Sequence, residues 1–207
     1  MSCAHAPVSY EQEVAAGRGE KDAAFKSGQD SPIPAAERAG FAGLSYFDID
    51  PSFRVAAALA ETEMSTRVIE MDTTDGTRQR MRVIGTLAFT LGGERRALTA
   101  YVPETSRDAR RLFVPFRDAT NRAETYGGGR YLDLERSSIG IYDLDFNRAY
   151  NPFCVYDTQY VCPLPPPENT LPLGIKAGEK MPRGKTMSFG GSGVREFGGS
   201  TVAGSRR

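Results

Sequence analysis

The chain has 207 residues, of which 40% are hydrophobic and 25% charged, a composition typical of a globular protein with one substantial core. Because 26 lysines and arginines balance 26 aspartates and glutamates, no net charge draws the molecule to nucleic acid or to an anionic membrane. No segment reaches the roughly 20 apolar residues of a membrane span, and the first residues lack the order of a secretory signal, so we expect a soluble, cytoplasmic protein without nucleic-acid or membrane partners.

The first predicted element is a helix over residues 9–26. Ser9 and Gln12 have the spacing of a capping box, and four side chains that follow Ser9 share one helical stripe. Gly28 and the segment DSPIP end the helix. The stripe consists of Tyr10, Val14, Lys21 and Phe25. Residues 1–8 are expected to form a mobile N-terminus.

From Phe41 onward, short runs rich in β-branched and aromatic residues alternate with turn signals, a pattern typical of antiparallel strands. Asp75-Gly76 and Gly92-Gly93 are the clearest hairpin turns. We predict a mainly β fold, a small antiparallel barrel or sandwich, in one domain over residues 9–182. The predicted strands are MRVIGTLAFTL, RALTAYV, RLFVPF, YLDLE and IGIYDLDFN.

After Asn151 the chain becomes dense in proline, with the sequence NPFCVYDTQYVCPLPPPENTLPLG. Proline cannot supply regular ladder bonds, so we expect an extended proline-rich C-terminal arm that lies against the sheet. Residues 183–207 are rich in Gly and Ser and are predicted to be disordered.

Several segments resemble familiar functional motifs but lack a required residue or spacing. GEKMPRGKT has five residues between its glycines where a phosphate loop needs four, and Asp143, Asp145 and Asn147 are not followed by the glycine of a calcium loop. A catalytic triad would have to recruit His5, the one histidine of the chain. Cys154 and Cys162 could form a disulfide, bind metal or stay buried thiols, and the lack of CxxC spacing favours buried thiols. No metal site is predicted.

The densest polar cluster is FRDATNRAETYGGGRYLD, residues 116–133. Asp118 and Glu124 could work together as a general acid and base across a turn, with Arg117 and Arg130 as donors to a ligand. The same charges could instead brace a loop through Arg–carboxylate bonds, and this structural alternative is slightly favoured.

The strand IYDLDFN alternates apolar with polar side chains, so one face belongs to a core. Asp143, Asp145 and Asn147 then face either solvent, which is the simpler interpretation, or a barrel lumen, where they would line a pocket.

The segments FRDATNRAETYGGGRYLDL, DFNRAYNP, CPLPPPEN and AGEK, with FAGLSYFDIDP upstream, resemble the short form of domain-of-unknown-function family 1684. The resemblance extends from about residue 20 to 180. Residues that stand in matching places are Asp118, Glu124, Tyr126, Arg130, Asp145, Asn147 and Asn151. The resemblance supports the fold and implies no reaction, substrate or cofactor.

The leading functional hypothesis is the binding of a small polar or anionic ligand at the open end of the barrel, with Asp118 and Glu124 as candidate catalytic residues. The predicted ligand-binding residues are Arg117, Tyr126, Arg130, Asp145, Asn147, Tyr150 and Asn151. The alternative is a non-enzymatic interaction module that uses the proline-rich arm. A flavin or haem carrier would rest on architecture alone, so the cofactor and the oligomeric state stay unknown.

Overall fold

The computed structural model describes residues 7–60, 67–106 and 110–185. The helix α1 spans Tyr10–Ser27 and begins at the expected capping box, in which Ser9 and Gln12 exchange backbone and side-chain hydrogen bonds. Gly28 ends the helix by donating its amide to the carbonyl of Ala24. The predicted helix is therefore confirmed. The expectations for residues 1–6 and 186–207 lie outside the described residues.

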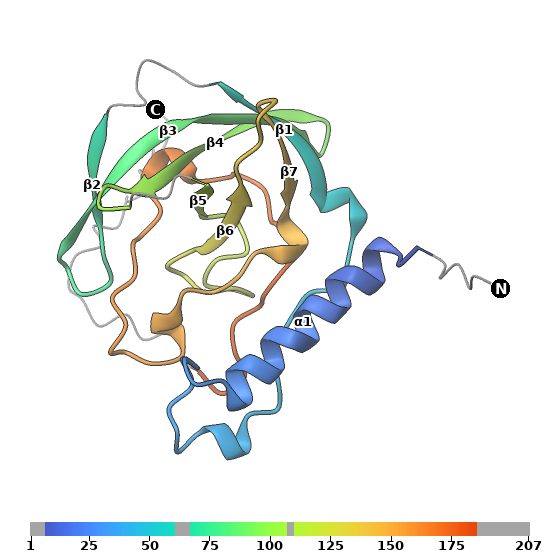
Figure 1. The fold of residues 1–207 in the computed structure, drawn as a ribbon, viewed down its shortest axis with the longest axis vertical. Helices are drawn as coiled ribbons and strands as arrows, with labels where there is room; N and C mark the ends of the chain where they lie inside the picture. The colour runs from blue at the N-terminus through green and yellow to red at the C-terminus, as the bar shows by residue number, and fades with distance from the viewer. Residues whose placement is uncertain (1–6, 61–66, 107–109, 186–207) are drawn as a thin grey trace, which may run out of the picture.

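The described residues form a seven-stranded antiparallel sheet in the order β6-β5-β4-β3-β1-β7, with β2 paired to β3. The end strands β6 and β7 contact one another, so the sheet is a nearly closed barrel, and α1 runs diagonally across one side of it (Figure 1). The strands are β1 (Arg54–Ala60), β2 (Val68–Asp72), β3 (Arg78–Leu91), β4 (Glu94–Pro103), β5 (Arg111–Phe116), β6 (Arg130–Glu135) and β7 (Ile141–Asp145).

The predicted strands correspond to β3 through β7, and the two glycine turns join β2 to β3 and β3 to β4. Neither β2 nor β1 was predicted from the sequence, and β1 has the sequence RVAAALA. Alanine favours a helix by intrinsic propensity, yet here the run is held between β3 and β7 by ladders on both sides. Beside β1, the pairing of β3 with β4 has a register shift between Val83 and Gly85.

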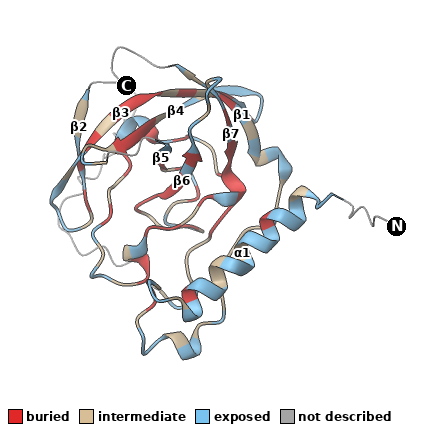
Figure 2. Cartoon of the chain, in the orientation of Figure 1, coloured by how far each residue is buried: buried red, intermediate tan, exposed pale blue. Residues whose placement is uncertain are grey.

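The barrel interior is the main core. On β5 and β6 the alternate residues Leu112, Val114, Leu132 and Leu134 point inward, where they join apolar side chains from β1, β3, β4 and β7. Figure 2 shows buried segments along these strands, whereas α1 is largely exposed and buries Val14 and Phe25. The lumen is therefore filled by apolar side chains over this length.

Short 3₁₀ helices and isolated bridges connect the rest of the described chain. The segment after β7 contains the 3₁₀ helices Phe146–Arg148, Phe153–Val155 and Pro167–Asn169. It pairs with the barrel at single bridges, Tyr131 with Tyr150, Thr73 with Pro163, and Arg117 with Thr170. Two further 3₁₀ helices, Arg38–Gly40 and Pro51–Phe53, lie between α1 and β1.

Candidate functional site

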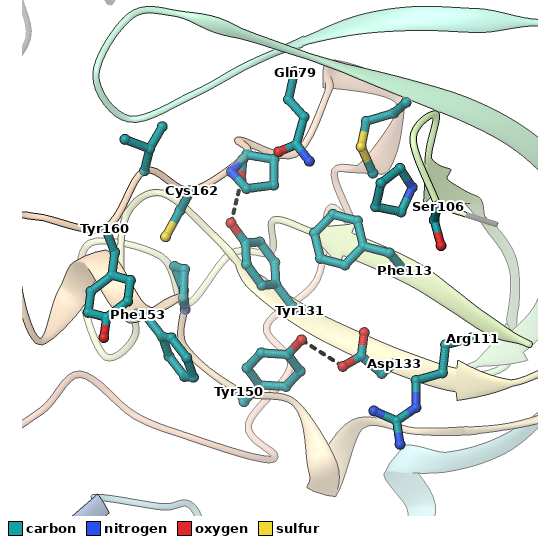
Figure 3. Close-up of a pocket in the computed structure, with 15 residues that line it drawn as sticks. Gln79, Ser106, Arg111, Phe113, Tyr131, Asp133, Tyr150, Phe153, Tyr160 and Cys162 are labelled. Carbon is teal, nitrogen blue, oxygen red and sulfur yellow. Dashed lines mark hydrogen bonds between the residues drawn. The ribbon is translucent and has the colours of Figure 1, made fainter. Parts of the chain in front are cut away.

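A pocket of about 420 Å³ lies on the outer face of the sheet, opposite the filled lumen. Phe113 on β5 and Tyr131 on β6 face it, because they alternate with the core residues Leu112 and Leu132. The segment around residues 150–163 supplies the facing wall, so the pocket lies between the sheet and this segment (Figure 3).

The pocket wall is rich in aromatic rings. Tyr131 meets Phe113 at 4.7 Å and Tyr150 at 5.7 Å between ring centroids, both edge to face. Across the pocket, Phe153 and Tyr160 pack edge to face at 5.4 Å. Edge-to-face contacts stabilise each ring against its neighbour, so the wall is preorganised.

Polar groups gather at one end of the pocket. The hydroxyl of Tyr150 donates a hydrogen bond to Asp133 at 2.9 Å, and Arg111 lies beside them with its guanidinium 3.2 Å from Glu135 (Figure 3). Burial, followed by the carboxylate of Asp133, raises the pKa of Tyr150 well above its usual range. The hydroxyl therefore keeps its proton at neutral pH and acts as the donor to Asp133.

The predicted residues Asp118 and Arg130 meet in a fully buried ion pair at 2.9 Å. Arg130 also donates to the backbone carbonyls of Ile175, Ala177 and Glu179, while Asp118 accepts from Thr120 and from the amide of Ile175. Both side chains are thus engaged with the protein itself, the arrangement that the bracing alternative describes. A role in acid–base chemistry or ligand binding would require this pair to open.

Other predicted residues of the polar cluster are held by different contacts. Glu124 forms an ion pair with Lys176 at 3.2 Å, and the backbone of Arg117 pairs with Thr170. Burial raises the pKa of Tyr126, which lies near Cys154. In the triple glycine, Gly129 has φ of 97°, and a Cβ there would lie 2.6 Å from the carbonyl oxygen of Phe116. The glycine therefore serves the approach of two backbone segments.

Asp145 and Asn147 lie under α1, on the outside of the barrel. The carboxylate of Asp145 accepts from the hydroxyl of Tyr10 at 2.8 Å, and Asn147 donates to the same hydroxyl and to the carbonyl of Asp50. The core-facing residues of this strand are Tyr142 and Leu144. The polar row consequently lies on the side away from the core. Asp143 faces solvent, whereas Asp145 and Asn147 are buried under α1 and face neither solvent nor the lumen.

Tyr150 and Asn151 are neighbours with different surroundings. The amide of Asn151 donates to the buried carboxylate of Glu179 at 2.8 Å, and its side chain donates to the carbonyl of Lys180. Tyr150 lines the pocket, and it alone does so among the nine predicted site residues, all of which are described. The structure therefore does not bring the nine predicted residues into one site. Asp118 and Arg130 form a buried ion pair, Asp145 and Asn147 bind α1, and Tyr150 lines the pocket. The other four make separate contacts.

Most of the pocket residues were not predicted from the sequence. Asp133 was counted in the polar cluster but not as a site residue, and Phe113 and Tyr131 were read only as strand residues. The available signal was period-two alternation, which places both aromatics and Asp133 opposite the leucines of their strands. Other missed residues are Arg111, Phe153, Tyr160 and Cys162.

Two general features of the described residues bear on function. They contain no group of three or more His, Cys, Asp or Glu side chains that could hold a metal ion. Within the same ranges, none of the helices has the length and apolar character needed to cross a bilayer.

Comparison with known proteins gives one solved structure of note and a family. The solution NMR structure of an uncharacterized protein from gene locus rrnAC0354 of Haloarcula marismortui is 43% identical, with a TM-score of 0.64. The alignment covers 83% of this chain and 94% of the other. A comparison with curated proteins gave no match. The model of the family described as "Protein of unknown function (DUF1684)" matches residues 39–180, more than half of the sequence, and the chain belongs to this family.

Proposed function

We propose that the protein binds a small molecule with a flat, apolar body and a polar end in the outer-face pocket. The observation that carries this proposal is the union of an aromatic wall with the hydrogen-bonded pair Asp133 and Tyr150 at one end. Apolar concave sites with a few placed polar groups are typical of small-molecule binding, and the volume lies in the usual range.

The chemistry of the polar end narrows the ligand class. The carboxylate of Asp133 accepts hydrogen bonds, and the guanidinium of Arg111 donates them. A ligand edge that both donates and accepts hydrogen bonds, as in a carboxamide or a nitrogen heterocycle, fits Asp133 and Arg111 better than a simple anion does. An anion would be repelled by the carboxylate of Asp133. The proposed ligand site thus lies on the outer face of the sheet and not at the mouth of the barrel. Of the residues predicted from the sequence, Tyr150 belongs to it.

A fragment screen by amide chemical shifts tests the proposal. Heteroaromatic carboxamides should perturb amides of β5, β6 and residues 150–163 as one connected patch. The variant Asp133→Asn removes the charged acceptor and should weaken binding by about tenfold, since a hydrogen bond to a charged group contributes about 1.5–3 kcal/mol. Asp143→Asn on β7 is the matched control, because Asp143 is exposed and outside the pocket.

Two results would contradict the proposal. One is a screen in which fragments perturb scattered amides without a patch at the pocket. The other is equal affinity for Asp133→Asn and Asp143→Asn, which would show that the polar end takes no part.

The alternative function, an interaction module that uses the proline-rich segment as an ordered arm, has one supporting observation. Phe153 and Val161 flank the pocket on this segment and are 38% and 51% exposed. Large exposed apolar side chains at a rim suit a protein partner. A screen in which no fragment reaches the pocket would favour this alternative.

Acid–base chemistry stays a second-rank proposal. Glu124 is partly exposed and could exchange protons more readily than Asp118, whose carboxylate is buried against Arg130. Unchanged turnover of an identified substrate by Glu124→Gln would remove this role.

A further inference from the structure

Two thiols meet at the wall of the pocket. Cys154 lies in the 3₁₀ helix Phe153–Val155, and its backbone amide donates to the sulfur of Cys162 at 3.3 Å. Both cysteines are free. The amide nitrogen and sulfur of one cysteine are only three bonds apart, so this contact places the sulfur of Cys162 beside the side chain of Cys154.

The segment between the thiols is held in a tight reversal that keeps them close. The amides of Gln159 and Tyr160 donate to the side chain and backbone of Asp157, respectively. Cys162 is then anchored to the β2–β3 turn, because its amide donates to the hydroxyl of Thr74 at 3.1 Å and its carbonyl accepts from the amide of Thr74 at 3.0 Å. The proximity of the two cysteines is thus built into the fold on both sides.

The surroundings give the two thiols different chemistry. The hydrogen bond from the Cys154 thiol, together with backbone amides, lowers the pKa of Cys162 despite its burial. The same hydrogen bond and burial raise the pKa of Cys154. Cys162 is consequently the thiol that more readily becomes the thiolate nucleophile, whereas Cys154 keeps its proton and donates a hydrogen bond to it.

Access to Cys162 comes through the pocket. Its residue is 6% exposed, yet it lines the pocket wall, where Figure 3 shows its sulfur among the lining side chains. Hydrogen peroxide is close to water in size, so it can reach a sulfur that a bulky alkylating reagent reaches poorly.

We propose that Cys162 and Cys154 form a redox pair that hydrogen peroxide converts to a disulfide. The thiolate of Cys162 attacks one peroxide oxygen, the O–O bond breaks, and the leaving hydroxide takes the proton of Cys154 to become water. The thiolate of Cys154 then attacks the sulfenic acid on Cys162, the S–O bond breaks, and the departing hydroxide takes a proton from solvent. Two thiols are oxidised, one peroxide is reduced to two waters, and a dithiol reductant reverses the change.

Intact-mass measurement tests the pair without altering the pocket. The test uses the Cys3→Ser variant, because Cys3 lies outside the described residues and would add a third thiol. Brief treatment with hydrogen peroxide should remove two hydrogen atoms in mass, peptide mapping should link Cys154 to Cys162, and dithiothreitol should restore the original mass. A product that carries added oxygen and no such link would overturn the proposal.

Two further variants, made in the same background and checked for folding by their amide spectra, assign the roles. Cys154→Ser should stop at a sulfenic acid on Cys162, trapped by a cyclic 1,3-diketone. Cys162→Ser should leave Cys154 unreacted under the same exposure, and equal reaction of both variants would contradict the assigned order. The readout is covalent and requires no ligand, so its outcome is independent of the small-molecule proposal.

Discussion

Arg122 has φ of 70°, a left-handed backbone that side chains other than glycine seldom adopt. It lies in the turn after Asp118, where its amide donates to the carbonyl of Thr125 and the side chain of Asn121 donates to Thr125 and Tyr126. These hydrogen bonds hold Arg122 in the left-handed conformation, although the conformation is sterically unfavourable for a residue with a Cβ.

We predict that Arg122→Gly raises the free energy of unfolding by about 1 kcal/mol, because glycine has no Cβ to clash in this conformation. Arg122→Ala is the control, since it also removes the guanidinium but keeps the Cβ. Urea unfolding of the three proteins measures the difference. Equal gains in both variants would show that the side chain, not the backbone, is the source of strain.

At the scale of elements, the strand β3 depends on a close approach to β1. Its register against β4 shifts between Val83 and Gly85, and a Cβ on Gly85 would lie 2.5 Å from the carbonyl oxygen of Ala60. That contact is with backbone, which cannot move aside without breaking the sheet. The close approach of β3 to β1 therefore requires a residue without a side chain at position 85.

Gly85→Ala should lower the free energy of unfolding by about 1–3 kcal/mol, the usual cost of forcing atoms into a packed site. Gly19→Ala in α1 is the matched control, because a Cβ there meets nothing within 4 Å and alanine favours a helix by up to about 1 kcal/mol. Thermal or urea unfolding should move the two variants in opposite directions. A stabilised Gly85→Ala would disprove the close-approach argument.

At the scale of the whole molecule, Arg130 joins parts of the chain that are distant in sequence. From β6 it reaches Asp118 after β5 and three carbonyls in residues 175–179. Glu179 continues the network, since its carboxylate accepts from Lys21 on α1, from the amide of Asn151 and from the hydroxyl of Tyr156. Barrel, helix and C-terminal segment are thus connected through buried polar contacts.

Arg130→Met should cost about 3–5 kcal/mol of stability, because it leaves the carboxylate of Asp118 buried and without its charged partner. Arg78→Met is the control: Arg78 forms exposed ion pairs with Glu70 and Asp72, and its loss should leave the urea midpoint within experimental scatter. Similar losses of stability in Arg130→Met and Arg78→Met would argue against a special stabilising role of the buried Asp118–Arg130 pair.

Much of the local structure was predictable because its causes are local. The capping box at Ser9 predicts where α1 begins, alternation predicts β3 through β7, and the pairs Asp75-Gly76 and Gly92-Gly93 predict the hairpins. β2 and β1 were not predicted, and β1 is an alanine-rich run that has little strand preference of its own. Its conformation comes from ladders to β3 and β7, which are distant in the chain.

The sequence alone determined the helix, most of the strands and the membership of Asp118 and Arg130 in one polar cluster. These features depend on helix capping, side-chain alternation and turn residues, which act over a few neighbouring residues. Tertiary structure decided that this pair is a buried clamp, that Asp145 and Asn147 anchor α1, and that the pocket lies on the outer face beside Tyr150. These outcomes depend on which segment covers each face of the sheet. Such coverage is set by contacts between residues far apart in the chain, which no local pattern records.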